Sequence, residues 1–366
     1  MHSEPSHSES LNSESLNSES SNSESWRSEL SHAFRSVVEL GRFLEIDLQA
    51  VPTQFPLLVP LAFALRMEKG NPDDPLLRQI LPVITENEPS PKGYSIDPLK
   101  EVTNTKDLSP LPDSNTVGEV LPKGLIQKYQ GRALVISTGQ CAVNCRYCFR
   151  RHFPYEDTQP TRSEWAAILA HIGSNESLSE VILSGGDPLV MNDNYLSEIM
   201  EKIAEIPHVE MLRIHTRTPV VIPSRIDEQL LAWVKKIEKP LTFVLHVNHP
   251  NEVNAALAEK MALLKEAGAV LLNQSVLLRG VNDNAEVLAQ LSRKLFAAGI
   301  LPYYLHRFDP VIGAHHFDVT EETGHKLINT ITNQLPGYLV PKFVQEVPGT
   351  LSKQALQPKT AQQTKR

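Results

Sequence analysis

All three cysteines of the 366-residue chain lie within eight positions, as Cys141, Cys145 and Cys148. A disulfide framework favours an even number of cysteines spread along a short secreted chain. A structural zinc site favours four ligands, usually in two pairs, and no second pair is present. The remaining interpretation is an iron–sulfur cluster held by thiolates. Three protein ligands on a four-iron cluster leave one iron open for a substrate or cosubstrate.

Two further stretches could do chemistry. The turn Ser184-Gly185-Gly186-Asp187 has exposed peptide groups that can bond an ammonium or a carboxylate, because glycines let a ligand approach the backbone closely. Taken alone, such a turn is ordinary. Near the C-terminal end, Lys353 is either a solvated charge or a lysine that holds pyridoxal phosphate (PLP) as a Schiff base. The residue pattern by itself leaves both interpretations open.

Alternating strands and helices follow from residue 133 and must position these stretches. The predicted strands are 133–137, 180–184, 211–215, 241–247, 270–278 and 301–305, and the predicted helices are 163–171, 192–206, 227–237, 251–267, 285–298 and 321–334. Six β–α units in series predict a parallel, barrel-like sheet. Six units are fewer than the eight of a closed barrel, so we expect an open (β/α)₆ partial barrel in the α/β class.

Polar or glycine-rich residues follow each predicted strand. These loops are 141–148, 184–187, 215–217, 248–251, 279–283 and the loop that contains Asp309. Active sites of barrel folds lie on the loops after the C-terminal ends of the strands. The predicted fold and the candidate motifs therefore point to the same end of the sheet.

The chain divides into four parts. Residues 1–25 repeat serine, asparagine and glutamate and predict a disordered tail, because few of them can be buried. Residues 26–123 predict a helical N-terminal region that ends in an irregular linker. Residues 124–335 form the predicted core, and residues 336–366 form a C-terminal segment that carries Lys353.

Composition excludes several classes of protein. A net charge of −8 and a pI near 5.9 argue against a general nucleic-acid binder, which would present a basic face. The apolar run 55–67 is short for a membrane span and contains Pro60. No pattern of a signal peptide is visible at the start. We therefore expect a cytoplasmic protein without a membrane partner, in a compartment that keeps thiols reduced.

The C-x₃-C-x₂-C spacing resembles that of the radical S-adenosylmethionine (SAM) enzymes, and the chain from about Gly124 to Lys353 resembles the lysine 2,3-aminomutases. The resemblance rests on 141–153, 183–189, 213–223, 248–252, 273–283, 302–304 and 337–341. Without a fourth cysteine, and ending soon after Lys353, the chain is similar to the family's short form, which supplies β-lysine for elongation factor P. The longer form carries a cysteine-rich extension.

The resemblance implies three cofactors and the residues that hold them. A [4Fe–4S] cluster is assigned to Cys141, Cys145 and Cys148; SAM to Ser184, Gly185, Gly186 and Asp187; and PLP to Lys353, with Arg132, Tyr129 and Lys128 near its phosphate. The open iron chelates SAM, and one electron cleaves SAM to a 5′-deoxyadenosyl radical. We therefore expect a reductant protein such as flavodoxin or ferredoxin as a partner.

The resemblance also implies the substrate and the groups that read it. Arg150 corresponds to the arginine that binds the carboxylate of L-lysine, and Asp309 with Glu346 corresponds to the acidic pair that reads the distal ammonium. The implied reaction moves the amino group from C2 to C3. Elongation factor P and its lysyl ligase are the implied functional partners, and self-association is left open.

Two other functions compete with this one. The first is an aminomutase for another amino acid, such as glutamate; Asp309 with Glu346 favours a cationic distal end and therefore lysine. The second is a non-catalytic iron–sulfur or zinc-binding interaction module, which would need neither Lys353 nor an arginine at a strand end.

Overall fold

Nine strands form one sheet in the order of the sequence, β1 to β9, in a computed structural model that describes residues 25–102 and 121–356. The strands are β1 (Leu125–Tyr129), β2 (Arg132–Thr138), β3 (Glu180–Gly185), β4 (Met211–Thr216), β5 (Leu241–His246), β6 (Val270–Val276), β7 (Leu301–His306), β8 (Lys342–Gln345) and β9 (Gln354–Ala355). Strands β2 to β8 are parallel, and β1 and β9 add antiparallel edges. The sheet stays open, because β1 and β9 are its two ends.

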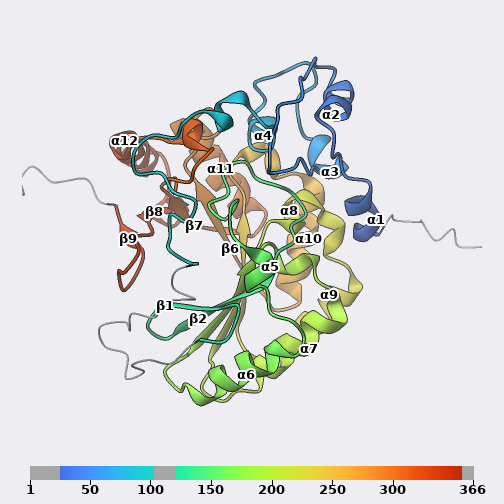
Figure 1. The fold of residues 1–366 in the computed structure, drawn as a ribbon, viewed down its shortest axis with the longest axis vertical. Helices are drawn as coiled ribbons and strands as arrows, with labels where there is room; N and C mark the ends of the chain where they lie inside the picture. Colours follow the sequence, from blue (N-terminus) through green and yellow to red (C-terminus); the bar gives the residue numbers. More distant parts are fainter. Residues whose placement is uncertain (1–24, 103–120, 357–366) are drawn as a thin grey trace, which may run out of the picture.

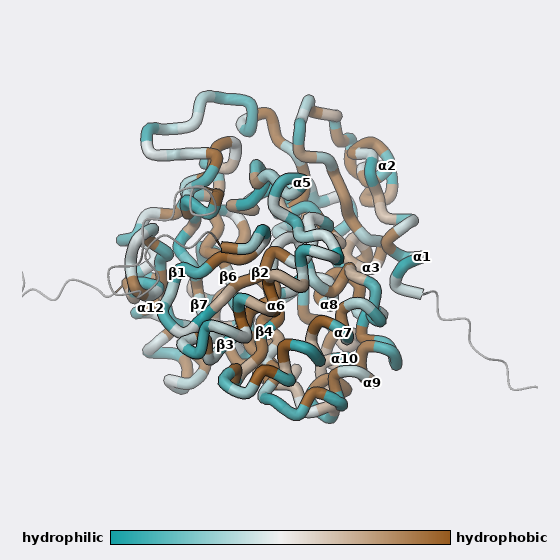
Figure 2. The backbone as a smooth tube through the Cα atoms, turned by 60° about the horizontal axis from the view of Figure 1, so that its bottom comes forward, coloured by the Kyte–Doolittle hydropathy of each residue, from teal (hydrophilic) through white to brown (hydrophobic). Residues whose placement is uncertain are grey.

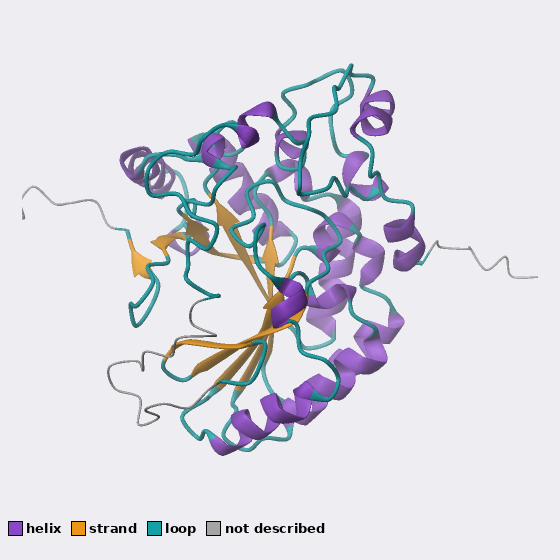
Figure 3. Ribbon diagram, in the orientation of Figure 1, coloured by secondary structure: helices purple, strands orange, loops and turns teal. Residues whose placement is uncertain are grey.

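Helices follow the parallel strands and cover the outside of the curved sheet (Figure 1, Figure 3). The longer ones are α6 (Glu164–Ser174), α7 (Asp193–Ala204), α9 (Glu228–Val234), α10 (Ala255–Glu266), α11 (Ala285–Ala297) and α12 (Glu321–Thr332). The six predicted β–α units and the open parallel barrel are confirmed. The prediction missed β8, which is a seventh parallel strand of only four residues. So short a run shows no periodicity that would separate it from a loop.

The main core lies between the strands and these helices. Strand β3 is buried at every position, as expected for a parallel strand with both faces covered. Leu183 packs in one cluster with Ile199 of α7 and Trp233 of α9. Figure 2 shows hydrophobic segments along the strands. The helices thereby fix the strands, and the strands fix the loops at their C-terminal ends.

The N-terminal segment packs beside α8 (Thr218–Val221) (Figure 1). Its helices are short: α1 (Trp26–Ser31), α2 (Val37–Leu44), α3 (Leu61–Ala64) and α4 (Pro75–Arg78), with a 3₁₀ turn at Ile84–Asn87. The apolar run 55–67 gives only the four-residue helix α3, whose N-cap is Pro60. Phe63 packs in one cluster with Ala142 and Val143 of the cysteine loop, so this segment supports that loop.

Parts of two predicted segments lie outside the described residues. Almost all of the predicted tail 1–25 and residues 103–120 of the predicted linker belong to these parts. Of the predicted C-terminal segment, residues 336–356 are described, and they contain β8, β9 and Lys353. No helix within 25–102 or 121–356 combines the length and the apolar character needed to cross a membrane.

Candidate active site

The cysteine loop follows β2 directly, and its three thiols are half-buried and free of disulfides. Burial raises the pKa of Cys148 to about 11, and the nearby Cys145 adds to this rise. Burial and the neighbouring Cys148 also raise the pKa of Cys141 well above its usual value. Thiols in this position stay protonated unless a positive centre stabilises the thiolates, and bound metal does so.

Three thiols from one loop can supply three ligands of a [4Fe–4S] cluster. Among the described residues, no three His, Cys, Asp or Glu side chains converge closely enough to hold one metal ion. The three thiols nevertheless affect one another electrostatically. Thiolates on different corners of a four-iron cluster stand further apart than the ligands of a single zinc ion. The arrangement thus fits a [4Fe–4S] cluster.

The glycine turn after β3 is bonded to the backbone that enters the cysteine loop. The Gly186 N–H donates to the Thr138 carbonyl at 2.7 Å, and the Asp187 N–H donates to the Gln140 carbonyl at 2.7 Å. A Cβ on Gly186 would lie 2.2 Å from the Gln140 carbonyl oxygen, so only glycine fits there. The sequence assigned this turn to SAM, and the structure places it directly against the cysteine loop.

The side chain of Asp187 accepts hydrogen bonds from within the protein. Its two carboxylate oxygens accept hydrogen bonds from the Leu189 N–H (3.0 Å), the Thr216 hydroxyl (2.7 Å), the Arg217 N–H (2.7 Å) and the Thr218 N–H (2.8 Å). These bonds fix the start of the loop after β4. Any ligand amino group at the turn would therefore meet its backbone carbonyls rather than a free Asp187 carboxylate.

Arg150 lies between the glycine turn and a glutamate of the N-terminal segment. Its Nη1 donates to the Ser184 hydroxyl at 3.0 Å and to the Gly185 carbonyl at 3.3 Å. Its Nε and Nη2 donate to the two carboxylate oxygens of Glu101 at 2.6 and 2.9 Å. Of the five N–H donors of a guanidinium, these contacts leave one N–H on Nη2 for a ligand.

A row of five alternating charges connects Arg150 to Lys353. Lys128 donates to Glu101 at 2.8 Å and to Glu346 at 2.7 Å, and Glu346 also accepts a hydrogen bond from Lys353. Burial favours a protonated Glu101, but Arg150 and Lys128 outweigh it and lower its pKa to about 2. Against the same effect of burial, Lys128 and Lys353 hold the pKa of Glu346 well below its usual range. Both carboxylates of the row therefore stay ionised at neutral pH.

Asp309, in the loop after β7, has no such compensation. Burial raises its pKa to about 7, and the negative charge of Glu346 adds to this rise, although Lys353 and Lys128 oppose it. Two carboxylates therefore share a buried region, and the uncompensated one is poised to accept a cation. Asp309 and Glu346 were predicted as a pair, and the structure places them close enough for the charge of Glu346 to act on Asp309.

The surroundings of Lys353 contain buried polar atoms. The Nε2 of His215 has no hydrogen-bond partner among the described residues, and burial together with Glu346 raises the pKa of the Tyr129 hydroxyl. Burial lowers the pKa of His215 well below its usual value, and Arg213, Lys353 and Arg150 lower it further, so its ring is neutral. An unpartnered ring nitrogen beside a lysine amine fits a ligand with a polar aromatic ring, such as PLP.

Arg132, which the resemblance places near the PLP phosphate, makes only loose contacts in the structure. Its guanidinium lies over the Tyr129 ring, 5.5 Å from its centroid, and its Nε is 3.9 Å from a carboxylate oxygen of Glu180. The side chain is 42% exposed, so it is free to turn towards a phosphate.

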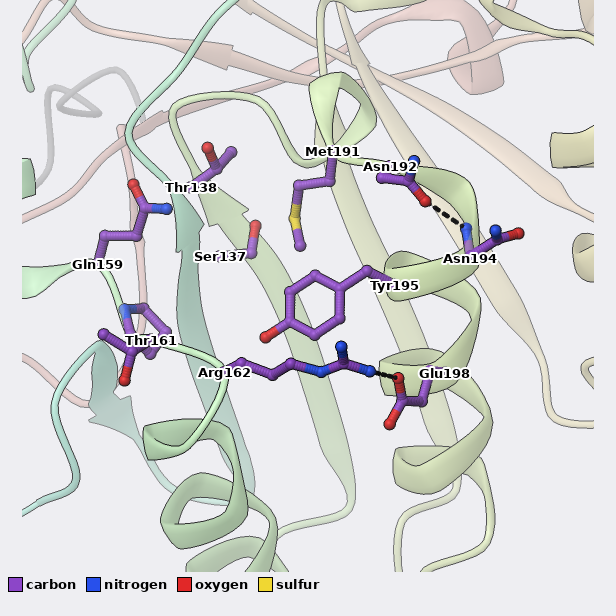
Figure 4. A pocket seen from close by; sticks show the side chains of 11 residues that line it. Ser137, Thr138, Gln159, Thr161, Arg162, Met191, Asn192, Asn194, Tyr195 and Glu198 are labelled. Atoms are coloured by element: carbon purple, nitrogen blue, oxygen red, sulfur yellow. Dashed lines mark hydrogen bonds and ion pairs between the residues drawn. The ribbon is translucent and has the colours of Figure 1, made fainter.

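A cavity of about 570 Å³ lies apart from this cluster of charges. It is lined by Ser137 and Thr138 of β2, by Arg162, and by Asn192, Tyr195 and Glu198 at α7. Figure 4 shows Arg162 running beneath the Tyr195 ring towards Glu198, to which it is bonded at 2.9 Å. None of the predicted site residues lines it.

Sequence reasoning missed several residues of the site. Glu101 lay in a segment predicted as an irregular connection, and Arg217 and His215 were named only within a strand-end loop. A signal for Arg217 was available, because it follows a predicted strand. No local signal marks Glu101, because its partner Arg150 is 49 residues away.

Comparisons with known proteins agree with this geometry. The sequence profile of the Radical SAM superfamily matches residues 135–291. Relatives named L-lysine 2,3-aminomutase match most of the chain. The one from Escherichia coli (strain K12) is 44% identical, over 89% of this chain and 92% of the relative. The one from Haemophilus influenzae is 42% identical, over 82% and 84%. The one from Clostridium subterminale is 34% identical, over 91% and 77%.

Proposed function

The chain belongs to the L-lysine 2,3-aminomutase family of the radical SAM superfamily, and from this premise we propose that it converts L-lysine to β-lysine and supplies β-lysine for the modification of elongation factor P. The observation that carries the proposal is the arrangement of charges between Arg150 and Asp309. Arg150 offers a cation to the substrate carboxylate. Asp309 offers a buried carboxylate to the distal ammonium.

The cofactors supply the bond chemistry. When bound, the cluster with SAM supplies a 5′-deoxyadenosyl radical and PLP supplies an electron sink for the migrating amino group. We assign the cluster to Cys141, Cys145 and Cys148, SAM to the turn 184–187, and PLP to Lys353 with Tyr129 and Arg132. The protein itself positions the substrate and excludes water.

Arg150 binds the substrate carboxylate in this proposal. The Ser184 hydroxyl and the Gly185 carbonyl hold one edge of its guanidinium, and Glu101 holds another. This fixes the plane of the guanidinium and leaves an Nη2 N–H for the ligand. A fixed donor favours one orientation of the substrate, which hydrogen transfer to a radical requires.

Asp309 binds the distal ammonium. The arriving cation stabilises the charged carboxylate and thus offsets the burial and the repulsion from Glu346 that raise its pKa. A substrate with a carboxylate at its distal end, such as glutamate, would add a further negative charge there. The site therefore selects lysine over glutamate.

Glu346 interacts directly with Lys353, and its interaction with the substrate is secondary. Its carboxylate holds the Nζ proton of Lys353 and is bonded to Lys128 as well. We propose that Glu346 stabilises the free ammonium of Lys353 whenever this amine is not bonded to PLP. It also supplies the negative field that the distal ammonium meets beside Asp309.

The assignment to elongation factor P rests on the greater similarity to the Escherichia coli relative, which is 44% identical, than to the Clostridium subterminale relative, which is 34% identical. The match covers 92% of the Escherichia coli relative but 77% of the longer Clostridium subterminale relative. The chain has no cysteine besides the three of the loop. We propose that it works in a reducing cytoplasm with a flavodoxin or a ferredoxin as electron donor, and that its product passes to the lysyl ligase of elongation factor P.

One experiment tests the activity and the choice of substrate. The anaerobically reconstituted protein is incubated with SAM, a reductant and either L-lysine or L-glutamate, and β-amino acid products are identified by mass spectrometry. β-Lysine from lysine, without product from glutamate, is expected. Product from glutamate alone would refute the lysine assignment. If elongation factor P, incubated with its ligase, this enzyme and lysine, stayed unmodified, the downstream role would be refuted.

A further inference from the structure

Arg217 places its guanidinium against one thiol of the cysteine loop. It directly follows β4, and its Nη1 donates to Cys145 Sγ at 2.7 Å and to the Tyr147 hydroxyl. The side chain is 6% exposed. Glu252 pairs with this guanidinium, and a metal-bound thiolate at Cys145 would give the buried charge a second negative partner.

The guanidinium is held from three directions. Its Nη2 donates to Glu252 at 2.9 Å and to the Gln79 side-chain oxygen at 2.7 Å. Asp187 accepts the backbone N–H groups of Arg217 and Thr218 and so fixes where the side chain begins. The contact with Cys145 is therefore built into the fold.

Gln79 gives the N-terminal segment a part in this arrangement. Besides Arg217, its side chain bonds Glu252 at 3.1 Å, and its backbone carbonyl accepts the Arg146 N–H of the cysteine loop at 2.8 Å. Residue 79 thus contacts both the loop and the arginine that faces it. The segment fixes the distance between the thiol and the guanidinium.

We propose that Arg217 is a positioning residue that orients Cys145 and raises the midpoint potential of the cluster. The proposal rests on the proposed function, because it requires a cluster at Cys141, Cys145 and Cys148. Hydrogen bonds to the sulfurs and nearby positive charge stabilise the reduced cluster, which carries one more negative charge. An easier one-electron reduction lowers the demand on the electron donor.

The test is an EPR-monitored redox titration of the reconstituted protein. Arg217→Gln removes the charge and the donor fork, and the double variant Arg217→Gln/Glu252→Gln also removes the carboxylate that the single change would leave unpaired. At the wild-type midpoint, we expect a ratio of reduced to oxidised cluster about tenfold lower in Arg217→Gln, a shift of about 59 mV for one electron. The double variant should shift in the same direction but by less, because it also removes the negative charge of Glu252.

Arg213→Gln is the matched control. Arg213 lies on the same strand and is paired with Glu180, and the titration of this variant should coincide with that of the wild type. Unchanged midpoints in both Arg217 variants, with four irons per chain, would overturn the inference. If Arg217→Gln folds natively but binds no iron, the result supports the role of Arg217 in orienting Cys145. The midpoint potential is then measured in Arg217→Lys, where a smaller decrease is expected. A wild-type chain without a four-iron cluster would instead refute the proposed function.

Discussion

Glu101 faces Arg150 with both of its carboxylate oxygens, at 2.6 Å from Nε and 2.9 Å from Nη2. This pair joins the N-terminal segment to the cysteine loop, and Lys128 binds the same carboxylate from the other side. Glu101 is 2% exposed, so its charge is almost fully removed from water. One carboxylate therefore balances two buried cations.

Glu101→Gln should destabilise the fold strongly. The change keeps the shape of the side chain but leaves Arg150 and Lys128 without their common counter-charge. Breaking a buried ion pair in this way costs about 3–5 kcal/mol, which urea denaturation would measure as a lower free energy of unfolding. Glu198→Gln is the control, because Glu198 binds Arg162 and Lys202 at the surface and exposed pairs add little. Equal unfolding midpoints for both variants would contradict the assigned role of Glu101.

Lysine binding should strengthen as the pH rises through 7. The pKa of Asp309 is about 7, so the carboxyl is about 9% ionised at pH 6 and about 91% ionised at pH 8. The distal ammonium stays charged over this range. The Kd for lysine, measured by calorimetry at each pH, should fall about tenfold from pH 6 to 8.

Asp309→Asn separates this effect from other titrations of the site. The variant should bind lysine at least roughly 30-fold more weakly at pH 8, since loss of one partner of a buried charge pair costs about 2 kcal/mol or more. Its residual binding should lack the tenfold pH dependence. An identical pH profile in wild type and variant would show that Asp309 does not face the ammonium.

Lys353→Ala should abolish covalent capture of PLP. The wild type, mixed with PLP and reduced with borohydride, should carry one pyridoxyl group in the peptide that contains Lys353. Lys342→Ala, an exposed lysine of β8, should retain that label. A label found on Lys128 instead would move the PLP site to the middle of the charged row.

Gly186→Ala should damage the cysteine loop. The added methyl group would lie 2.2 Å from the Gln140 carbonyl oxygen, which belongs to backbone that cannot turn away. We expect a loss of about 1–3 kcal/mol in stability and fewer irons per chain after reconstitution. Gly173→Ala in α6 has nothing within 4 Å of its new methyl and should reconstitute like the wild type.

Local patterns predicted most of the fold. The runs 180–184 and 241–247 are strands because short apolar stretches between helical patterns have few alternatives. The cysteine spacing and the glycine turn were recognisable because their function depends on short-range geometry. These predictions needed no knowledge of which segments meet.

Pairing across long distances could not be predicted. Glu101 meets Arg150 and Lys128 only because the N-terminal segment folds back over the sheet, and nothing near residue 101 marks that contact. Asp187 was expected to face SAM, yet its oxygens accept four hydrogen bonds from within the protein. A carboxylate in a functional turn has the same sequence pattern whether it binds the ligand or the neighbouring loop.

The row Arg150–Glu101–Lys128–Glu346–Lys353 also limits how such a protein can evolve. Glu101 and Glu346 each neutralise two cations, so replacing either glutamate alone leaves at least one buried cation uncompensated. A glutamate of the row and a neighbouring cation should therefore be replaced together during evolution. Among related sequences, the residues at 101, 128 and 346 should covary, although they are far apart in the chain.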